Sequence, residues 1–262
     1  MGSAVARRLS DYPLAVYARF RTRAKYSKYF TKYYAIYGQT AKTVLYCIMN
    51  LCVRFWIMQV RLLEDGTYAS NCYLVYDDAM TGAVVIDPSV SPKRFLGLLA
   101  NLPPITMLIL THSHFDHMLA IDEWRSETGA PLAVSEADSY GLTNPMLSCF
   151  RQFLGEERTF APAERLLKTG DVIRVGSERL TVTEVPGHTP GCIILDSGEL
   201  LFTGDTVFAG GGYGRYDLPG GDGAILFRSI ASIMRIEGER RLFAGHGGEG
   251  LLSEEKKFYN FS

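Results

Sequence analysis

The segment His112-Ser113-His114-Phe115-Asp116-His117 contains three of the five histidines in this chain of 262 residues. The other two lie in Gly187-His188-Thr189 and Gly245-His246-Gly247, and Gly204-Asp205-Thr206 falls between them. Imidazole and carboxylate groups collected in this way are the ligands that divalent transition metals bind in proteins. No histidine lies outside this pattern, so the sequence predicts a protein built around a metal site.

The spacing within the first segment predicts how its side chains point. His112 and His114 are two residues apart, so in an extended backbone their side chains leave on the same side and can share one ion. Asp116 and His117 follow at the turn into the next helix and can point at a neighbouring ion. His188 lies in a turn fixed by proline and glycine, which orients its imidazole.

The two remaining residues complete a second site. Asp205 is a short carboxylate at the end of a strand, which suits it to bridge two cations about 3.5–4 Å apart. His246 closes the second site. Two ions placed in this way would hold a bridging hydroxide at neutral pH and would polarise a carbonyl or phosphoryl oxygen, so that no Ser or Cys nucleophile is required.

Short apolar runs separated by turn residues surround these segments and predict an α/β fold. We expect strands at 60–63, 71–76, 83–87, 105–110, 171–175, 179–184, 193–196, 200–203 and 242–244, and helices at 91–102, 118–127 and 224–236. The strand at 105–110 is continuously apolar, which predicts burial on both faces. Ser91 is placed to cap the first helix. Each candidate ligand follows a strand, and two mixed sheets packed face to face with helices outside would bring these loops together.

Composition narrows the class of protein. The net charge of −1 hides a split, because residues 1–58 carry ten Lys or Arg against the single acid Asp11. The remainder holds 17 basic and 27 acidic residues, a balance that does not suit a nucleic acid substrate. The five cysteines are odd in number and never spaced as CxxC, which favours a reducing, cytoplasmic setting.

Residues 1–57 differ from the rest of the chain, because they are basic and rich in tyrosine. We therefore expect two parts, an N-terminal extension over 1–57 and a catalytic domain over 58–262. The extension is either dispensable for catalysis, or a helical accessory element for the domain or a second subunit, or a segment for targeting or membrane contact. Its apolar run at 43–60 is interrupted by Asn50, Arg54 and Gln59, which makes a membrane span marginal.

The ordered set of motifs resembles the metallo-β-lactamase superfamily over residues 58–262. The resemblance implies a four-layer αββα sandwich and two divalent metal ions per chain, with Zn as the first expectation and Fe or Mn as alternatives. It also implies the ligands: His112, His114 and His188 for the first ion, Asp116, His117 and His246 for the second, and Asp205 bridging both. True β-lactamases commonly have Cys where this chain has Asp205, which disfavours antibiotic hydrolysis.

Finer motifs at 203–208, 214–221 and 245–247 resemble the short glyoxalase II-like hydrolases. The resemblance implies hydrolysis of a small-molecule thioester of the hydroxyacylglutathione type, with Asp116 and Asp205 as the catalytic carboxylates. Full-length glyoxalase II holds glutathione with a C-terminal helical domain, and because only 16 residues follow His246 we expect no such domain here, so the thiol carrier stays open. The alternatives are a mononuclear-iron persulfide dioxygenase and a lactonase or phosphodiesterase of the same superfamily.

The glycine-rich loop 208–222 follows Asp205 and is a candidate lip for the substrate. Arg215 is the one cation in this loop and can receive a substrate carboxylate. Alternatively, Arg215 pairs with Asp217 or Asp222 and holds the loop. Tyr216, where such hydrolases usually have Thr or Ser, is the second candidate for substrate contact.

Overall fold

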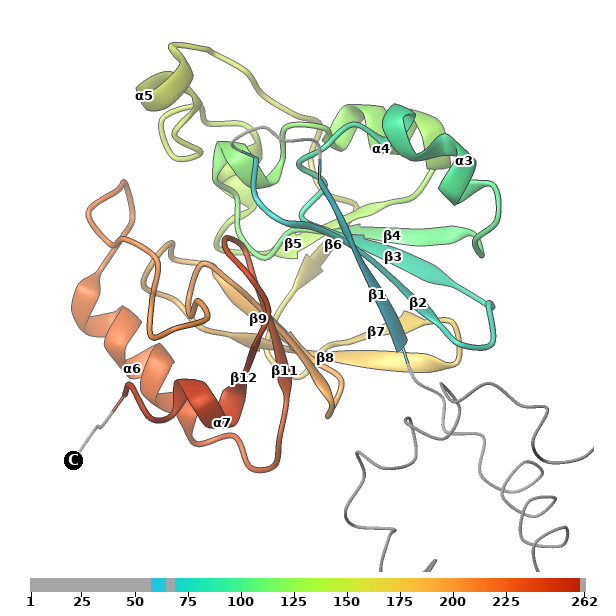
Figure 1. Ribbon diagram of the computed structural model, residues 1–262. Coiled ribbons are helices and arrows are strands. Elements are labelled where there is room, and N and C mark those ends of the chain that lie inside the picture. Colours follow the sequence, from blue (N-terminus) through green and yellow to red (C-terminus); the bar gives the residue numbers. More distant parts are fainter. Residues whose placement is uncertain (1–57, 65–68, 260–262) are drawn as a thin grey trace, which may run out of the picture. The chain divides into compact units, whose positions relative to one another are not determined.

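A computed structural model describes residues 58–64 and 69–259, and these form two six-stranded sheets packed face to face (Figure 1). The expected extension over 1–57, with its apolar run, lies outside the described residues. Within the described part of the chain, no helix is long and apolar enough to cross a membrane.

The first sheet has the strand order β1-β2-β3-β4-β5-β6. Its strands are β1 (Met58–Leu63), β2 (Cys72–Asp77), β3 (Ala83–Ile86), β4 (Ile105–Ile109), β5 (Leu132–Ser135) and β6 (Arg165–Leu167). The first three strands pair antiparallel, whereas β3 to β6 run parallel. The parallel strands therefore deliver their following loops to one edge of the sheet, which is where ligand sites of α/β proteins form.

The second sheet has the order β12-β11-β10-β9-β8-β7. Its strands are β7 (Val172–Val175), β8 (Glu178–Glu184), β9 (Ile193–Asp196), β10 (Leu200–Gly204), β11 (Arg241–Ala244) and β12 (Gly250–Leu251). All pairs are antiparallel except β10 with β11. The turns at Gly176-Ser177 and Ser197-Gly198 form hairpins, because β7 pairs with β8 and β9 with β10 around them.

Three apolar cores separate four layers. The central core lies between the sheets, where the rings of Phe202 and Phe243 stack with centroids 5.1 Å apart and Tyr73 meets both edge-on. An outer core joins the first sheet to the helices α3 (Leu96–Leu99), α4 (Ile121–Thr128) and α5 (Phe150–Leu154). The other outer core joins the second sheet to α6 (Gly223–Met234) and α7 (Leu252–Glu255) (Figure 1). The expected αββα sandwich is confirmed.

Two expected helices are shorter than the sequence pattern indicated. The pattern over 91–102 forms a 3₁₀ helix at Pro92–Phe95 followed by the single turn of α3. Ser91 does not cap it, because its hydroxyl donates a hydrogen bond of 2.5 Å to Glu123 instead. The pattern over 118–127 becomes helical only at Ile121, and the helix ends at Thr128 because Gly129 after it adopts the left-handed φ of +67°. The apolar residues before each helix pack into the core. A periodic pattern of apolar residues shows which positions are buried, but it does not show where the helix itself begins.

Other elements escaped the sequence analysis. The strands β5, β6 and β12 and the helices α5 and α7 are two to five residues long, too short to show a period. Strand β4 is also less enclosed than expected. Thr106 is exposed, and burial is complete only at Leu108 and Ile109, where the strand approaches the metal motif.

Candidate metal centre

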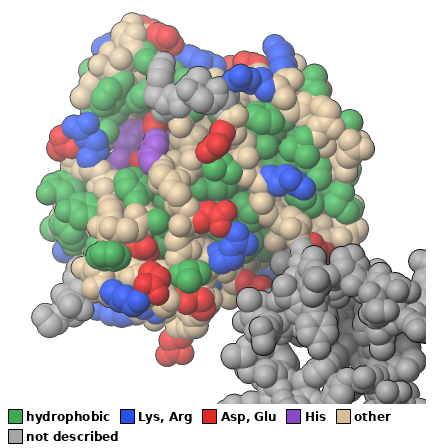
Figure 2. All heavy atoms as spheres, viewed as in Figure 1, with side chains coloured by type: hydrophobic (Ala, Val, Ile, Leu, Met, Phe, Trp, Pro, Cys, Tyr) green, Lys and Arg blue, Asp and Glu red, His purple; other side chains and the backbone are tan. Residues whose placement is uncertain are grey.

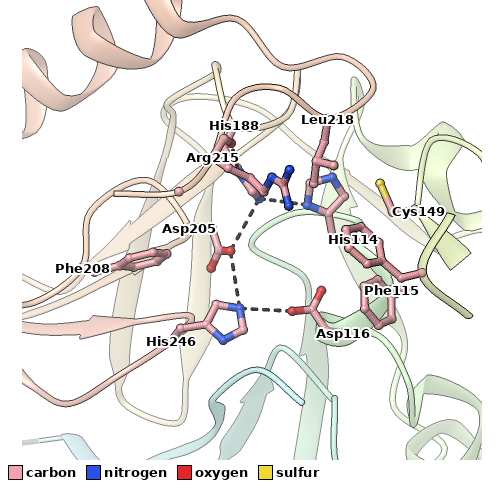
Figure 3. A pocket seen from close by; sticks show the side chains of 12 residues that line it. His114, Phe115, Asp116, Cys149, His188, Asp205, Phe208, Arg215, Leu218 and His246 are labelled. Carbon is pink, nitrogen blue, oxygen red and sulfur yellow. Dashed lines mark hydrogen bonds and ion pairs between the residues drawn. The ribbon is translucent and has the colours of Figure 1, made fainter. Parts of the chain in front are cut away.

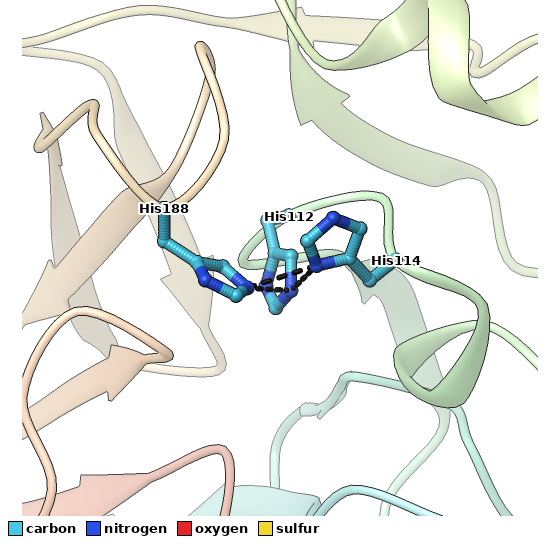
Figure 4. Close-up of side chains that lie close together, drawn as sticks. All are labelled: His112, His114 and His188. Carbon is cyan, nitrogen blue, oxygen red and sulfur yellow. Dashed lines mark hydrogen bonds between the residues drawn. The ribbon is translucent and has the colours of Figure 1, made fainter. Parts of the chain in front are cut away.

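Three histidine nitrogens face one another at the end of the sandwich where the strands deliver their loops (Figure 4). His112 Nε2 lies 3.1 Å from His114 Nδ1 and 3.1 Å from His188 Nε2, and the last two nitrogens are 2.8 Å apart. His112 and His114 follow β4 of the first sheet, whereas His188 follows β8 of the second. The expected first ligand group is therefore brought together from both sheets.

The hydrogen bond on the far side of His188 fixes which nitrogen is protonated. His188 Nδ1 donates to the backbone carbonyl of Arg215 at 2.5 Å, so Nε2 is the nitrogen that can offer a lone pair on the side of the other two histidines. Three nitrogens that all face one point cannot all be satisfied by the hydrogens they carry, because a ring N–H serves one partner at a time. A cation at that point would satisfy all three, so these residues fit a metal ion.

A second group lies beside the first. His246 Nε2 is 3.1 Å from Asp116 Oδ2, and His117 Nε2 is 3.9 Å from the same oxygen. These three residues form a further potential cation site, which matches the expected second ligand group. Asp116 and His117 belong to the first sheet's loop and His246 to the turn after β11, so this group also spans both sheets.

Asp205 stands between the two groups (Figure 3). Its Oδ1 lies 3.4 Å from His117 Nε2, and its Oδ2 lies 3.5 Å from both His188 Nε2 and His246 Nε2. Within the described part of the chain, Asp205 Oδ1 and His117 Nε2 are buried without a hydrogen-bond partner. Unpartnered buried polar atoms are costly in a protein, and a bound cation would satisfy both.

The charges around the site favour a cation. Burial lowers the pKa of His112 and lowers the pKa of His114 to about 3, so both rings stay neutral and offer lone pairs. Burial alone would lower the pKa of His117 as well, but nearby carboxylates, Asp87 first among them, raise it well above its usual value. Burial would raise the pKa of Asp205, yet His117 holds it below its usual range. The carboxylates thus draw a proton to the position that a cation would take.

Asp87 is a residue of the site that the sequence analysis placed only as the last residue of a strand. It is buried, its Oδ2 accepts a hydrogen bond from His117 Nδ1 at 2.9 Å, and its oxygens also accept the backbone N–H and the hydroxyl of Thr111. The Nδ1 hydrogen is therefore engaged, so Nε2, which faces Asp116 and Asp205, is the nitrogen that could exchange its proton for a cation. The signal was an aspartate directly after a buried apolar run at a parallel strand end.

The two ligand groups lie at the bottom of a cavity of about 300 Å³. Histidine side chains are visible from outside the molecule in Figure 2, with hydrophobic and charged side chains around them. The walls of the cavity are mainly apolar or aromatic and are formed by Phe115, Cys149, Phe153, Phe208 and Leu218. A pocket of this kind has room for a small molecule beside the two ligand groups.

The two candidates for substrate contact differ in position. Arg215 lines the cavity and forms a bidentate ion pair with Asp217, with bonds of 2.7 Å from Nε and Nη2. Asp222 instead caps α6 by accepting the N–H of Ile225. Tyr216 is not among the residues that line the cavity, and its ring lies beside Phe227 with centroids 6.3 Å apart. The position of Tyr216 therefore gives no support to a substrate role.

Comparison with known proteins places this arrangement in a family. A family model described as the metallo-β-lactamase superfamily matches residues 65–246. The hydroxyacylglutathione hydrolase GloC of Haemophilus influenzae is 28% identical over 205 residues, which cover 76% of this chain and 96% of that protein. The match to the family begins after the N-terminal segment.

Solved structures agree with this placement. BLEG-1 B3 metallo-β-lactamase is 28% identical with a TM-score of 0.70, over 78% of this chain and 99% of that one. The di-iron form of TTHA1623 is 30% identical with a TM-score of 0.65, over 78% and 100%. ETHE1 from Myxococcus xanthus is 28% identical with a TM-score of 0.63, over 76% and 82%. The chain belongs to the metallo-β-lactamase superfamily, whose members bind divalent metals through the kind of His/Asp cluster found here.

Proposed function

We propose that this protein is a metal-dependent hydrolase that cleaves a small-molecule thioester at a pair of divalent cations. The observation that carries the proposal is the convergence of two ligand groups, with Asp205 between them, at the base of one apolar cavity. The similarity to a hydroxyacylglutathione hydrolase over 96% of its length supports the thioester as substrate class.

In this proposal, His112, His114 and His188 hold one cation, Asp116, His117 and His246 hold the other, and Asp205 contacts both. Two bound divalent cations would acidify a water molecule and polarise a carbonyl oxygen. Zinc suits imidazole and carboxylate ligands, and iron or manganese are accepted by the same ligand types. TTHA1623, which is similar to this chain, has been solved in a di-iron-bound form, and this supports iron as an alternative to zinc.

Thioester hydrolysis also requires an oriented water molecule, a leaving group that departs readily and a place for the acyl group. Asp116 is partly exposed to the cavity, so its second oxygen is available to hold and orient an attacking water molecule. A thiolate leaves more readily than an alkoxide because the pKa of a free thiol is about 8.5, so a thioester does not require a strong general acid. The apolar walls hold the acyl group against the site and limit competing water.

The structure disfavours a mechanism with a cysteine nucleophile. Cys149 lines the cavity, but burial and then the charge of Asp116 raise the pKa of its thiol to about 11. A thiol with that pKa is protonated at neutral pH and reacts poorly. Cys149 therefore serves as part of the apolar wall in this proposal.

One observation favours a second candidate function. His112, His188 and Asp205 form a group of two imidazoles and one carboxylate, with His188 Nε2 3.1 Å from His112 Nε2 and 3.5 Å from Asp205 Oδ2. Two histidines and one carboxylate are the ligand set of many non-haem iron oxygenases. This set would suit a persulfide dioxygenase with a single iron.

A panel of substrates tests the proposal against this alternative. The full chain, depleted of metal and reloaded with zinc, iron or manganese, is assayed with S-lactoylglutathione, a lactone and a phosphodiester, and for oxygen consumption with glutathione persulfide. We expect hydrolysis of the thioester and no oxygen consumption. Oxygen consumption by the iron form without thioester hydrolysis would favour the dioxygenase. Activity on the lactone or the phosphodiester alone would show that the substrate is not a thioester.

Arg215→Ala separates a substrate contact from a structural ion pair. We expect KM for S-lactoylglutathione to rise about 10-fold at unchanged kcat, because a charge-assisted hydrogen bond to a substrate carboxylate contributes about 1.5–3 kcal/mol. The Tm should barely change, since an exposed ion pair contributes about 0–1 kcal/mol. The backbone carbonyl that accepts from His188 is kept in this variant. Arg241→Ala, which removes an ion pair of similar exposure with Glu249, is the control, and an unchanged KM for Arg215→Ala would assign it to the loop alone.

A further inference from the structure

Two polar residues outside the ligand set connect loops of the two sheets beside the metal centre. We infer that Asp138 positions the three-histidine group and that Asn71 positions the group formed by Asp116, His117 and His246, so that each residue controls the affinity of one cation site. The inference rests on the proposed function, because it presupposes that both groups bind a metal ion.

Asp138 is almost completely buried, at 3% exposure, and its carboxylate joins the loops that carry the three histidines. Its Oδ2 accepts the backbone N–H of Ser113 at 2.8 Å and the hydroxyl of Thr189 at 2.8 Å. Its Oδ1 accepts the backbone N–H of Gly191 at 2.7 Å. Ser113 lies between His112 and His114, and Thr189 follows His188, so one carboxylate fixes the distance between the two halves of this group.

Burying an ionised carboxylate is costly unless it accepts several hydrogen bonds. Here the bonds go to loop backbone and to a loop hydroxyl, on both sides of the boundary between the sheets. The backbone N–H of Ile193 also donates to the carbonyl of Thr111 at 2.9 Å, and the hydroxyl of Ser135 donates to the carbonyl of Gly191 at 2.5 Å, so other bonds join the same loops. Asp138 is the side chain that bonds to the residue between His112 and His114 and to the residue after His188, and it therefore helps to set the separation of imidazoles that approach one another to about 3 Å.

Asn71 makes the corresponding connection at the second group. Its backbone N–H donates to the carbonyl of Gly245 at 2.7 Å, and its Nδ2 lies 3.0 Å from the carbonyl of Ala244 and 2.9 Å from that of Gly247. These three carbonyls surround His246 along the chain. Asn71 precedes β2 of the first sheet, whereas the turn with His246 follows β11 of the second.

The residue before Asn71 extends this connection to the other half of the same group. The backbone N–H of Ser70 donates to the carbonyl of Asp116 at 3.1 Å. The segment Ser70-Asn71 thus contacts the backbone of both Asp116 and the turn that carries His246. Support around metal ligands commonly changes metal affinity by about 10–100-fold, and here the two supports are separate residues that act on separate groups.

Zinc affinity measured in two background variants of the full chain tests this division. His246→Ala leaves the three-histidine group, and His188→Ala leaves the other group. Competition with a chromophoric chelator gives the Kd of the remaining zinc ion in each background. We expect Asp138→Asn to weaken zinc binding about 10-fold in the His246→Ala background and by less than about 2-fold in the other. Asn71→Ala should show the reverse pattern.

Asp77→Asn is the matched control. Asp77 is also a buried carboxylate that joins the two sheets, because it accepts hydrogen bonds from Thr81 and from Ser177. It ends β2, whereas Asn71 precedes the start of that strand, so it lies about 20 Å from the site at about 3.3 Å per residue. We expect it to lower Tm and leave both zinc Kd values unchanged.

Milder variants keep the test usable if the first two fail to fold. Thr189→Val removes one bond to Asp138 without a change of charge and should weaken the same site about 3-fold, and Asn71→Ser should act like Asn71→Ala. Equal effects of the Asp138 and Asn71 variants in both backgrounds, or effects no larger than those of Asp77→Asn, would overturn the inference. Failure of the unsubstituted chain to bind zinc, iron or manganese would overturn the proposed function itself, which is a different result.

Discussion

Asp205→Asn is expected to lower kcat for thioester hydrolysis by about 10³-fold and to release at least one metal ion per chain. Asp205 is the side chain whose two oxygens face both ligand groups, with Oδ1 toward His117 and Oδ2 toward His188 and His246. An amide removes the negative charge and one of the two acceptor oxygens. A metal site contributes several kcal/mol to charge stabilisation in the transition state, and each 1.36 kcal/mol corresponds to about 10-fold in rate.

The measurement is kcat together with metal content after dialysis. Asp196→Asn is the control, because Asp196 ends a strand of the same sheet and pairs with Arg240 away from the site. This control should retain its metal ions and its kcat. An Asp205→Asn protein that keeps two ions and normal turnover would show that Asp205 is not part of the reacting centre.

Gly245→Ala is the second substitution with a large expected effect, about 100-fold or more in kcat. A methyl group on Gly245 would collide with Asp205 Oδ1 and with the ring of His117, so one or both must move. A displacement of about 1 Å at a catalytic centre costs about 10²-fold in rate. We expect weaker metal binding as well, because both displaced residues belong to the ligand groups.

Gly248→Ala is the matched control for this substitution. Gly248 lies three residues along the same turn, its φ is not in the left-handed region, and nothing lies within 4 Å of the added methyl group. Its kcat and metal content should stay within about 2-fold of the unsubstituted chain. If Gly245→Ala behaves in the same way, the close packing of this turn against Asp205 has no functional role.

The candidate ligands could be predicted from sequence because each one lies in a segment that follows a strand end. A strand end fixes both the position and the direction of the next few residues, and the parallel strands β3 and β4 end at the same edge. The pairing of His112 with His114 follows from their spacing alone. His188 and His246 follow other strands. Only the order of the motifs along the chain indicated that these two residues would lie near His112 and His114.

The supporting residues could not be predicted, because their role depends on contacts between distant parts of the chain. Asp138 acts through residues 25 to 53 positions away, and Asn71 through residues more than 170 positions away. Neither lies in a motif of ligand residues. Ser91 also depends on a distant contact. The local sequence predicted that it caps a helix, but its hydroxyl bonds to Glu123, 32 residues away, instead.

The residues that form the walls of the cavity could not be predicted from the sequence either. Phe115 and Phe153 stack with centroids 5.4 Å apart, although 38 positions separate them and α5 was not expected. Tyr216 was a candidate for substrate contact because short glyoxalase II-like hydrolases usually have Thr or Ser there, but its ring packs beside Phe227. The candidate ligands therefore lie in local motifs, whereas the cavity above them is formed by tertiary packing of loops that are distant in sequence.

Titration of the metal-depleted full chain with zinc, followed by the rate of S-lactoylglutathione hydrolysis at each occupancy, tests the central claim most directly. The account predicts that hydrolysis rises with bound zinc and reaches its plateau near two ions per chain, because both ligand groups and the shared Asp205 are needed. A chain that binds two zinc ions and hydrolyses no thioester, or that reaches full activity with one ion, would contradict it.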